Sequence, residues 1–296
     1  MLDGLRGIAI ALVMLMHLSL LPNGFMGVDL FFALSGFLIT TLLYEEWERT
    51  GSLSFSRFYE RRARRLLPAL LILVAGAVLV NTFAYTLTGW PLGRKALTTL
   101  LFANNWVAGL GKSSQLGGLC PTWSLAQEEQ FYLVWPLLLV LMLRRRFSPR
   151  LVAAALAAGV AGLIWWVSPH LTASIRDYST YYSPADRSAE LLLGCLGAVL
   201  WRHRLVPEPA RLLSRVSARA ARQAARVARP ARVALCCVLI YLFARLLLGN
   251  GPTRPTYLLA CALAVVLIPN LLAVPESLPA RLIGCAPLRR LGRISY

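Results

Sequence analysis

Long apolar runs separated by short polar segments dominate the pattern of this chain of 296 residues. Eight of these runs approach the ~20 mostly apolar residues that a membrane-spanning helix needs. They lie at 7–21, 26–44, 66–86, 123–143, 151–168, 188–203, 233–249 and 256–274. A further apolar patch at 96–110 is ambiguous, because Asn104, Asn105 and Trp106 interrupt it. The pattern predicts an all-α, polytopic transmembrane helix bundle with about eight spans.

Basic residues in the connecting segments favour one orientation of these spans. Arginine clusters follow the runs 26–44, 123–143, 188–203 and 256–274. If the patch at 96–110 is re-entrant or interfacial, every cluster falls on one side, which the positive-inside rule identifies as the cytoplasm. If the patch spans fully, Arg144 to Arg146 lie outside, against that rule. We therefore predict a cytoplasmic N-terminus, with the basic stretch 202–232 lying on anionic lipid headgroups.

Composition agrees with an integral membrane protein. Hydrophobic residues make up 57% of the chain and charged residues 15%, against about 25% charged residues in an average soluble domain. The net charge of +18 would suit nucleic acid, but the basic residues alternate with long apolar runs. We therefore expect the lipid bilayer, and no nucleic acid, as a partner. The six cysteines show no zinc-ligand or disulfide spacing, and no metal site is expected.

Ionisable residues in the first two spans form a candidate site, because a charge within the bilayer is costly. Arg6 and His17 are eleven residues apart, so they share one face of the first helix about three turns apart. Asp29 opens the second span after a short turn at 21–24, and we expect it at a depth similar to that of His17. A carboxylate beside an imidazole fixes its tautomer for proton transfer. The alternative is a hydrogen bond that only packs the helices together.

Two further groups are candidates, one of arginines and one of carboxylates. Arg61, Arg62 and Arg65 share one helical face before the third span, where they form a phosphate-binding rim or serve only as topology determinants. Glu128 and Glu129 open the run 123–143, where they need counter-charges or a wet cavity.

Other polar and aromatic residues near these spans have simpler explanations. Trp123 and Tyr132 suit an aromatic belt at the membrane surface. Asp186, Arg187 and Glu190 are expected to pair among themselves.

These motifs resemble those of the acyltransferase-3 family of membrane acyltransferases. The segments that carry the resemblance are 2–9 with His17, 27–39, 58–68 and 123–132, and the similarity covers residues 1–296. The resemblance implies a ten-helix membrane domain that moves an acyl group, commonly acetyl, from cytoplasmic acyl-coenzyme A to a hydroxyl. The implied acceptor is an envelope polysaccharide, a lipid-linked glycan or a small glycoside. The implied location is the bacterial inner membrane.

The resemblance also implies roles for individual residues. The catalytic set comprises His17, Asp29, Glu128 and Glu129. The set near the phosphates of acetyl-coenzyme A comprises Arg6, Arg61, Arg62 and Arg65. The chain ends at 292–296, where the family usually begins another span, so we expect a domain that lacks about two helices at its C-terminus.

A proton-coupled membrane transporter is the alternative function, because intramembrane Arg, His and Asp are typical of such carriers. The sequence shows no inverted repeat and no matched pair of broken helices, which favours the enzyme. A non-catalytic scaffold would not need several separate polar groups within its spans.

Overall fold

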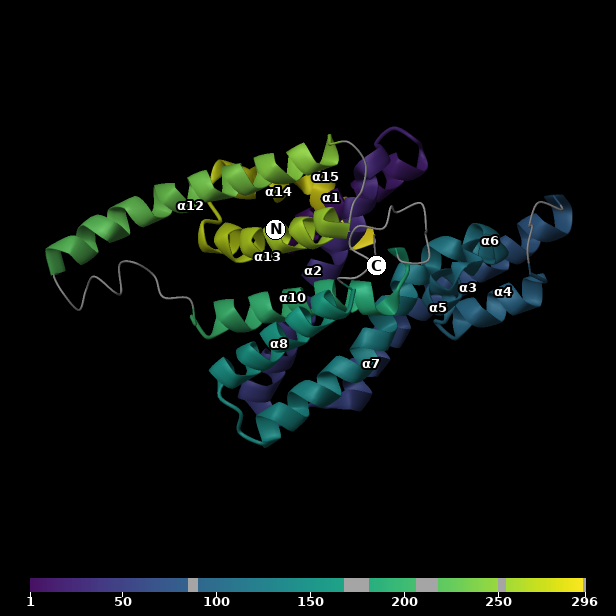
Figure 1. Cartoon of the computed structure of the whole chain (residues 1–296), viewed down its shortest axis with the longest axis horizontal. Helices are drawn as coiled ribbons and strands as arrows, with labels where there is room; N and C mark the ends of the chain where they lie inside the picture. Colours follow the sequence, from purple (N-terminus) through teal and green to yellow (C-terminus); the bar gives the residue numbers. More distant parts are fainter. Residues whose placement is uncertain (85–89, 168–180, 206–217, 250–253, 295–296) are drawn as a thin grey trace. The chain divides into compact units, whose positions relative to one another are not determined.

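The computed structural model describes residues 1–84, 90–167, 181–205, 218–249 and 254–294. Within these ranges the chain forms helices joined by turns, and no strand (Figure 1). Contacts divide the chain into two compact units. The first unit comprises Met1–Thr41, Phe147–Val160 and Glu190–Ser295, and the second comprises Leu42–Arg146 and Ala161–Ala189. The all-α prediction is confirmed.

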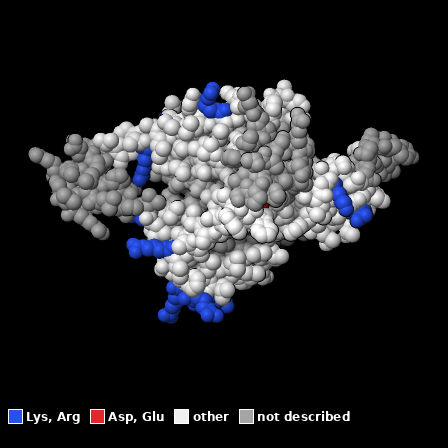
Figure 2. All heavy atoms as spheres, viewed as in Figure 1, with Lys and Arg blue, Asp and Glu red and all other residues white. Residues whose placement is uncertain are grey.

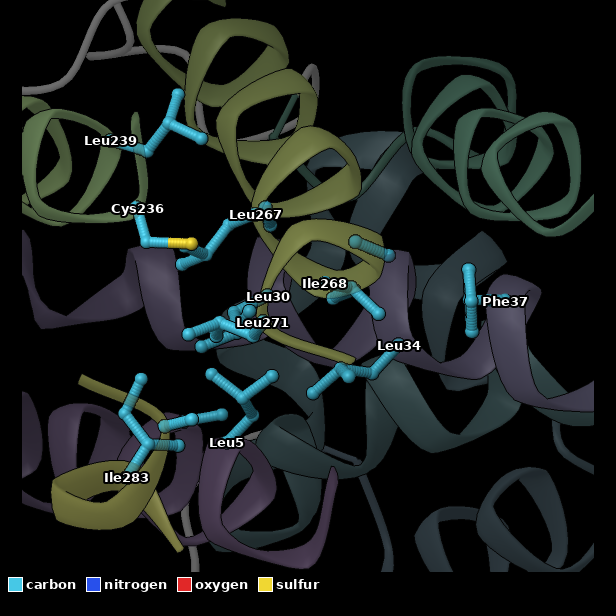
Figure 3. Packing of buried hydrophobic residues seen from close by; sticks show 14 of the residues in the cluster. Leu5, Leu30, Leu34, Phe37, Cys236, Leu239, Leu267, Ile268, Leu271 and Ile283 are labelled. Atoms are coloured by element: carbon cyan, nitrogen blue, oxygen red, sulfur yellow. The ribbon is translucent and has the colours of Figure 1, made fainter. Parts of the chain in front are cut away.

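The first unit contains both ends of the described chain. Its elements are α1 (Leu2–His17), η1 (Pro22–Phe25), the first part of α2 (Met26–Thr50), parts of α8 (Pro149–Val167) and α10 (Pro184–Arg202), α12 (Ala218–Leu247), α13 (Arg254–Ala273), α14 (Leu278–Ile283) and α15 (Ala286–Ile294). Their shared core is apolar, and Figure 3 shows Leu5, Leu34, Ile268, Leu271 and Ile283 converging from α1, α2, α13 and α14. Close packing of such side chains holds helices together even where lipid replaces water.

The C-terminal helix α15 packs directly against α1, which carries the first candidate site. A Cβ atom at Gly7 would overlap the backbone carbonyl of Leu288, and one at Gly292 would overlap that of Asp3. Only glycine permits backbones to approach this closely. Arg293 also reaches the Asp3 carboxylate at 3.6 Å. The glycines of the N-terminal motif therefore have a packing role in this unit.

The second unit joins two long helices to a series of short ones. Its elements are α3 (Phe55–Ala84), α4 (Leu92–Leu100), α5 (Asn104–Val107), η2 (Ala108–Lys112), α6 (Ser113–Leu116), η3 (Gly117–Thr122) and α7 (Trp123–Arg144). Buried Asn104 connects three of them: its amide nitrogen lies 2.8 Å from Thr99 Oγ1, 2.6 Å from Thr122 Oγ1 and 3.2 Å from the Leu119 carbonyl. Short helices have few contacts of their own, so such hydrogen bonds fix their arrangement.

Each predicted span corresponds to a helix among the described residues, with different boundaries. Five helical stretches of the described residues are long and apolar enough to cross a membrane. They lie at Pro22–Thr50, Phe55–Val80, Pro149–Trp166, Val227–Leu247 and Thr256–Ala273. The runs 7–21, 123–143 and 188–203 correspond to α1, α7 and α10. The patch at 96–110 contains parts of short helices, so it does not form one continuous span.

Asn23 closes the last turn of α12 and offers a test of the fold of the first unit. Its buried amide nitrogen lies 3.4, 3.1 and 2.8 Å from the carbonyl oxygens of Leu246, Leu247 and Gly249. Leu246 and Leu247 end α12 and Gly249 follows it, so their carbonyls lack the donor four residues later that a regular helix supplies. We expect Asn23→Ala to lower the free energy of unfolding by about 1–3 kcal/mol, measured by denaturant unfolding in detergent.

Asn270→Ala is the matched control for this experiment. Its amide nitrogen donates to the carbonyl of Val266 on the same helix, at 2.8 Å, in an exposed hydrogen bond. Surface substitutions of this kind change stability by about 0.5 kcal/mol or less. Equal losses in the two variants would show that Asn23 does not fasten α12.

Candidate functional site

His17 ends α1 with an exposed side chain. Its Nδ1 atom lies 2.8 Å from the Val13 carbonyl oxygen, one helical turn earlier. A carbonyl oxygen only accepts hydrogen bonds, so Nδ1 carries the proton in this arrangement. The tautomer with its proton on Nδ1 has its lone pair on Nε2. Two residues later, Ser19 adopts a left-handed φ of 59° as the chain turns away. The local backbone thus presents an exposed imidazole with an acceptor nitrogen.

Two glycines show how the start of α2 lies against α1. A Cβ atom at Gly24 would lie 2.9 Å from Met16 Cβ, and one at Gly27 would lie 2.9 Å from Val13 Cγ2 and 3.2 Å from the Ala9 carbonyl carbon. As the chain advances from Gly24 to Gly27, its contacts on α1 move back from Met16 towards Ala9. The two elements are therefore antiparallel and closely packed.

This register corrects the expected depth of Asp29. Asp29 follows Gly27 by two residues, so it lies level with the first half of α1, about two helical turns from His17. The prediction assumed that the turn at 21–24 only reverses the chain, whereas η1 already packs along α1. Asp29 on α2 is fully buried, and Arg6 on α1 is nearly so. The level of α1 beside Asp29 lies about one helical turn from Arg6. The structure therefore places Asp29 nearer the level of Arg6 than that of His17.

Arg62 is the central charged residue of the second unit. Its Nη2 pairs with Glu129 Oε1 on α7, and its guanidinium carbon lies 3.6 Å from the centre of the Tyr132 ring. Glu128 adds electrostatic attraction from the next position on α7. An ion pair that also stacks on an aromatic face has little freedom to move. The structure thus joins the arginine motif to the acidic motif, which the sequence alone left separate.

The three arginines do not form a common rim in this structure. Arg61 lies 3.6 Å from Glu46 at the end of α2, and its side chain is largely exposed. The Glu46 carboxylate also accepts a hydrogen bond from the Ser54 backbone, at 3.0 Å. Arg65 is exposed and Arg62 is turned towards α7. The phosphate-binding role of these arginines stays a prediction.

A buried amide cluster stands beside Glu128 and Glu129 in the sequence of α7, and sequence reasoning did not identify it as a site. The Asn105 amide nitrogen lies 3.0 Å from the side-chain oxygens of both Gln127 and Gln130. Gln130 donates in turn to the Phe102 carbonyl at 2.7 Å, and the Trp106 indole donates to Gln130 at 3.2 Å. The only sequence signal for it was uncharged amides within apolar or acidic surroundings.

Trp123 is buried rather than placed as an aromatic-belt residue. Its ring lies 5.1 Å from the rings of Tyr181 and Tyr182 and 5.5 Å from the Arg187 guanidinium. Arg187 donates to the Tyr181 carbonyl at 2.8 Å, a contact that the expected pairing with nearby acids did not include.

Burial raises the pKa of the Cys120 thiol, and this effect is larger than the lowering by its hydrogen bond with Tyr182. Tyr132 is likewise buried, under Arg62.

The basic side chains are spread out on the face of the molecule that Figure 2 shows. Figure 2 shows the basic side chains of one face in separate small groups among uncharged residues. In the predicted basic stretch, Arg211 and Arg215 lie outside the described residues. α12 begins at Ala218, so residues 218–232 of that stretch are helical, and Arg229 pairs with Glu276 at 2.9 Å. Contact of this helix with lipid headgroups stays a prediction.

Curated relatives of this chain include O-acetyltransferases from two bacteria. The chain is 31% identical over 309 residues to the peptidoglycan O-acetyltransferase OatA of Listeria monocytogenes, an alignment that covers 100% of this chain and 47% of that protein. It is 35% identical over 219 residues to the O-acetyltransferase OatA of Staphylococcus aureus, covering 68% of this chain and 34% of that protein. The chain thus spans about half, or less, of the length of these relatives. No solved structure matches it.

The family comparison covers the entire sequence. The family described as an acyltransferase domain matches residues 1–296. This match includes α1 with His17 as well as α3 and α7 with the Arg62–Glu129 pair. The sequence-based assignment is confirmed, and the chain belongs to the acyltransferase-3 family of membrane acyltransferases.

Proposed function

We propose that this chain is the membrane part of an O-acetyltransferase that moves an acetyl group from cytoplasmic acetyl-coenzyme A to a hydroxyl of an envelope glycan. The names of its relatives, peptidoglycan O-acetyltransferase and O-acetyltransferase, support this acceptor class and this acyl group. Peptidoglycan is therefore the first acceptor to test. The single observation that carries the proposal is the exposed His17, whose Nδ1 is bonded to the Val13 carbonyl.

His17 is the proposed catalytic base. Its Nε2 takes the proton from the acceptor hydroxyl as that oxygen attacks the thioester carbonyl. The carbon–sulfur bond then breaks, and the coenzyme leaves as a thiolate that takes up a proton. Val13 supplies the hydrogen bond that a carboxylate supplies in other catalytic histidines. Asp29 is not needed for this step.

Other charged residues of each unit have supporting roles in the proposal. Asp29 balances the buried charge of Arg6, because the two lie at neighbouring levels of the first unit. In the second unit, Arg62 binds a phosphate of the donor, since a guanidinium matches phosphate oxygens. Glu129 then acts as a positioning residue for Arg62 rather than as a catalytic acid. Arg61 and Arg65, whose side chains are exposed, add contacts to the donor.

The proposed location is the bacterial inner membrane, with the N-terminus in the cytoplasm. Basic clusters after four of the predicted spans support this orientation through the positive-inside rule. A cytoplasmic donor and an envelope acceptor then lie on opposite sides of the bilayer.

A transfer assay tests the proposal directly. The full-length protein is reconstituted in vesicles with acetyl-coenzyme A labelled in the acetyl group, and soluble peptidoglycan fragments are added. We expect thiol release that depends on the acceptor, and base-labile label on the glycan. Flux of a solute coupled to protons, without thiol release or labelled glycan, would overturn the proposal in favour of a transporter.

A further inference from the structure

Pro136 leaves a gap in the hydrogen bonding of α7. Proline has no backbone N–H, so within a helix the carbonyl four residues earlier loses its donor. In α7 that carbonyl belongs to Tyr132. The proline ring also pushes this carbonyl outwards, away from the helix axis. A polar oxygen inside a membrane protein then needs another donor.

Tyr59 of α3 supplies that donor. Its hydroxyl oxygen lies 3.3 Å from the Tyr132 carbonyl oxygen and 3.2 Å from that of Leu133. The single hydroxyl proton is shared between these two carbonyls. Both contacts join α3 to the part of α7 whose hydrogen bonding Pro136 interrupts. Tyr59 and Pro136 are 77 positions apart in the chain and are linked only by the fold.

The contact between Tyr59 and Tyr132 lies one helical turn from the ion pair between Arg62 and Glu129. Arg62 follows Tyr59 by three residues on α3, and Glu129 precedes Tyr132 by three residues on α7. Because these helices run antiparallel at this point, a bond between Tyr59 and Tyr132 sets Arg62 opposite Glu129. Tyr132 takes part twice, since its carbonyl accepts from Tyr59 and its ring lies under the Arg62 guanidinium.

We propose that Tyr59 is a positioning residue, whose hydroxyl replaces the donor that Pro136 removes and so holds Arg62 between Glu129 and Tyr132. The link to the acyl donor rests on the proposed function, in which Arg62 binds a donor phosphate. The hydrogen-bond replacement itself does not depend on that function, so the two parts can be tested separately.

The first test is a double-mutant cycle on thermal unfolding. Tyr59→Phe removes the hydroxyl, and Pro136→Ala restores the backbone N–H of α7. We expect Tyr59→Phe alone to lower the melting temperature by about 3–6 °C. In the Pro136→Ala background the same change should cost less than half as much, because the Tyr132 carbonyl then has its helical donor. Equal shifts in the two backgrounds would overturn the proposal.

The second test asks whether Tyr59 acts through Arg62. We expect Tyr59→Phe to raise the KM for acetyl-coenzyme A about 3–10-fold, with a smaller change in kcat. In an Arg62→Ala background the KM should not rise further when the hydroxyl is removed. Independent, multiplying effects would show that Tyr59 does not position Arg62. If the parent protein uses no acetyl-coenzyme A, the proposed function fails, while the thermal cycle still decides the hydrogen-bond replacement.

Tyr241→Phe is the matched control for both tests. Tyr241 lies on α12 in the first unit, and its side chain is exposed. Loss of this hydroxyl should leave the melting temperature and the KM unchanged. Shifts as large as those of Tyr59→Phe would mean that any tyrosine hydroxyl gives the same result, and the proposal would fall.

Discussion

Replacing His17 with alanine is expected to lower acetyl transfer about 10²–10⁴-fold, the range that general-base catalysis contributes. His17→Asn should lose as much, because an amide cannot accept the proton of the acceptor hydroxyl. Stability should hardly change, since the His17 side chain is exposed and its hydrogen bond lies within its own helix. The measurements are labelled-acetyl transfer in vesicles and thermal unfolding of the same preparations.

Met14→Ala is the control for these variants. Met14 lies one turn before His17 on α1 and is also exposed, but it has no group that takes up a proton. The rate of acetyl transfer by Met14→Ala should stay within about twofold of that of the parent protein, because surface substitutions have small effects on the fold. Near-normal transfer by a folded His17→Ala protein would remove His17 from the mechanism. An equal loss in Met14→Ala would assign the effect to the helix end rather than to the imidazole.

The periodicity of apolar residues was sufficient to predict the helices, but not which helices pack against one another. Each long run recurs as a helix because, within a bilayer, the backbone must satisfy its own hydrogen bonds. The boundaries differ where charged residues join a helix: α3 begins at Phe55, so Arg62 lies inside it. Hydropathy alone had set that span to begin at residue 66. Local composition therefore indicates which segments are helical, and polar flanks decide where they begin.

The candidate site shows the same division between local and long-range information. His17, Arg62 and Glu129 were identified from their residue types and spacing. The Arg62–Glu129 pair joins positions 67 apart, and no local pattern encodes that contact. The predicted depth of Asp29 was wrong, because this depth depends on how η1 packs on α1. The amides Asn105, Gln127 and Gln130 escaped notice since uncharged polar residues carry a weak signal in sequence.

Gly7→Leu is expected to destabilise the first unit by about 3 kcal/mol or more, because overpacking that involves backbone atoms is hard to relieve. The new side chain would overlap the carbonyl of Leu288 and displace α15 from α1. Since α1 also carries Arg6 and His17, transfer should fall at least tenfold together with stability. Denaturant unfolding and the transfer assay on one preparation give both values.

Gly76→Leu separates this steric effect from the general effect of adding a side chain to a helix. Gly76 lies within α3, and a Cβ atom built there meets no atom within 4 Å. Leucine forms helices better than glycine, so this variant should match the parent or gain about 0.5–1 kcal/mol. A stable, active Gly7→Leu protein would mean that α15 does not press against α1. The close approach of Gly7 to Leu288 would then have no part in holding the helix that carries His17.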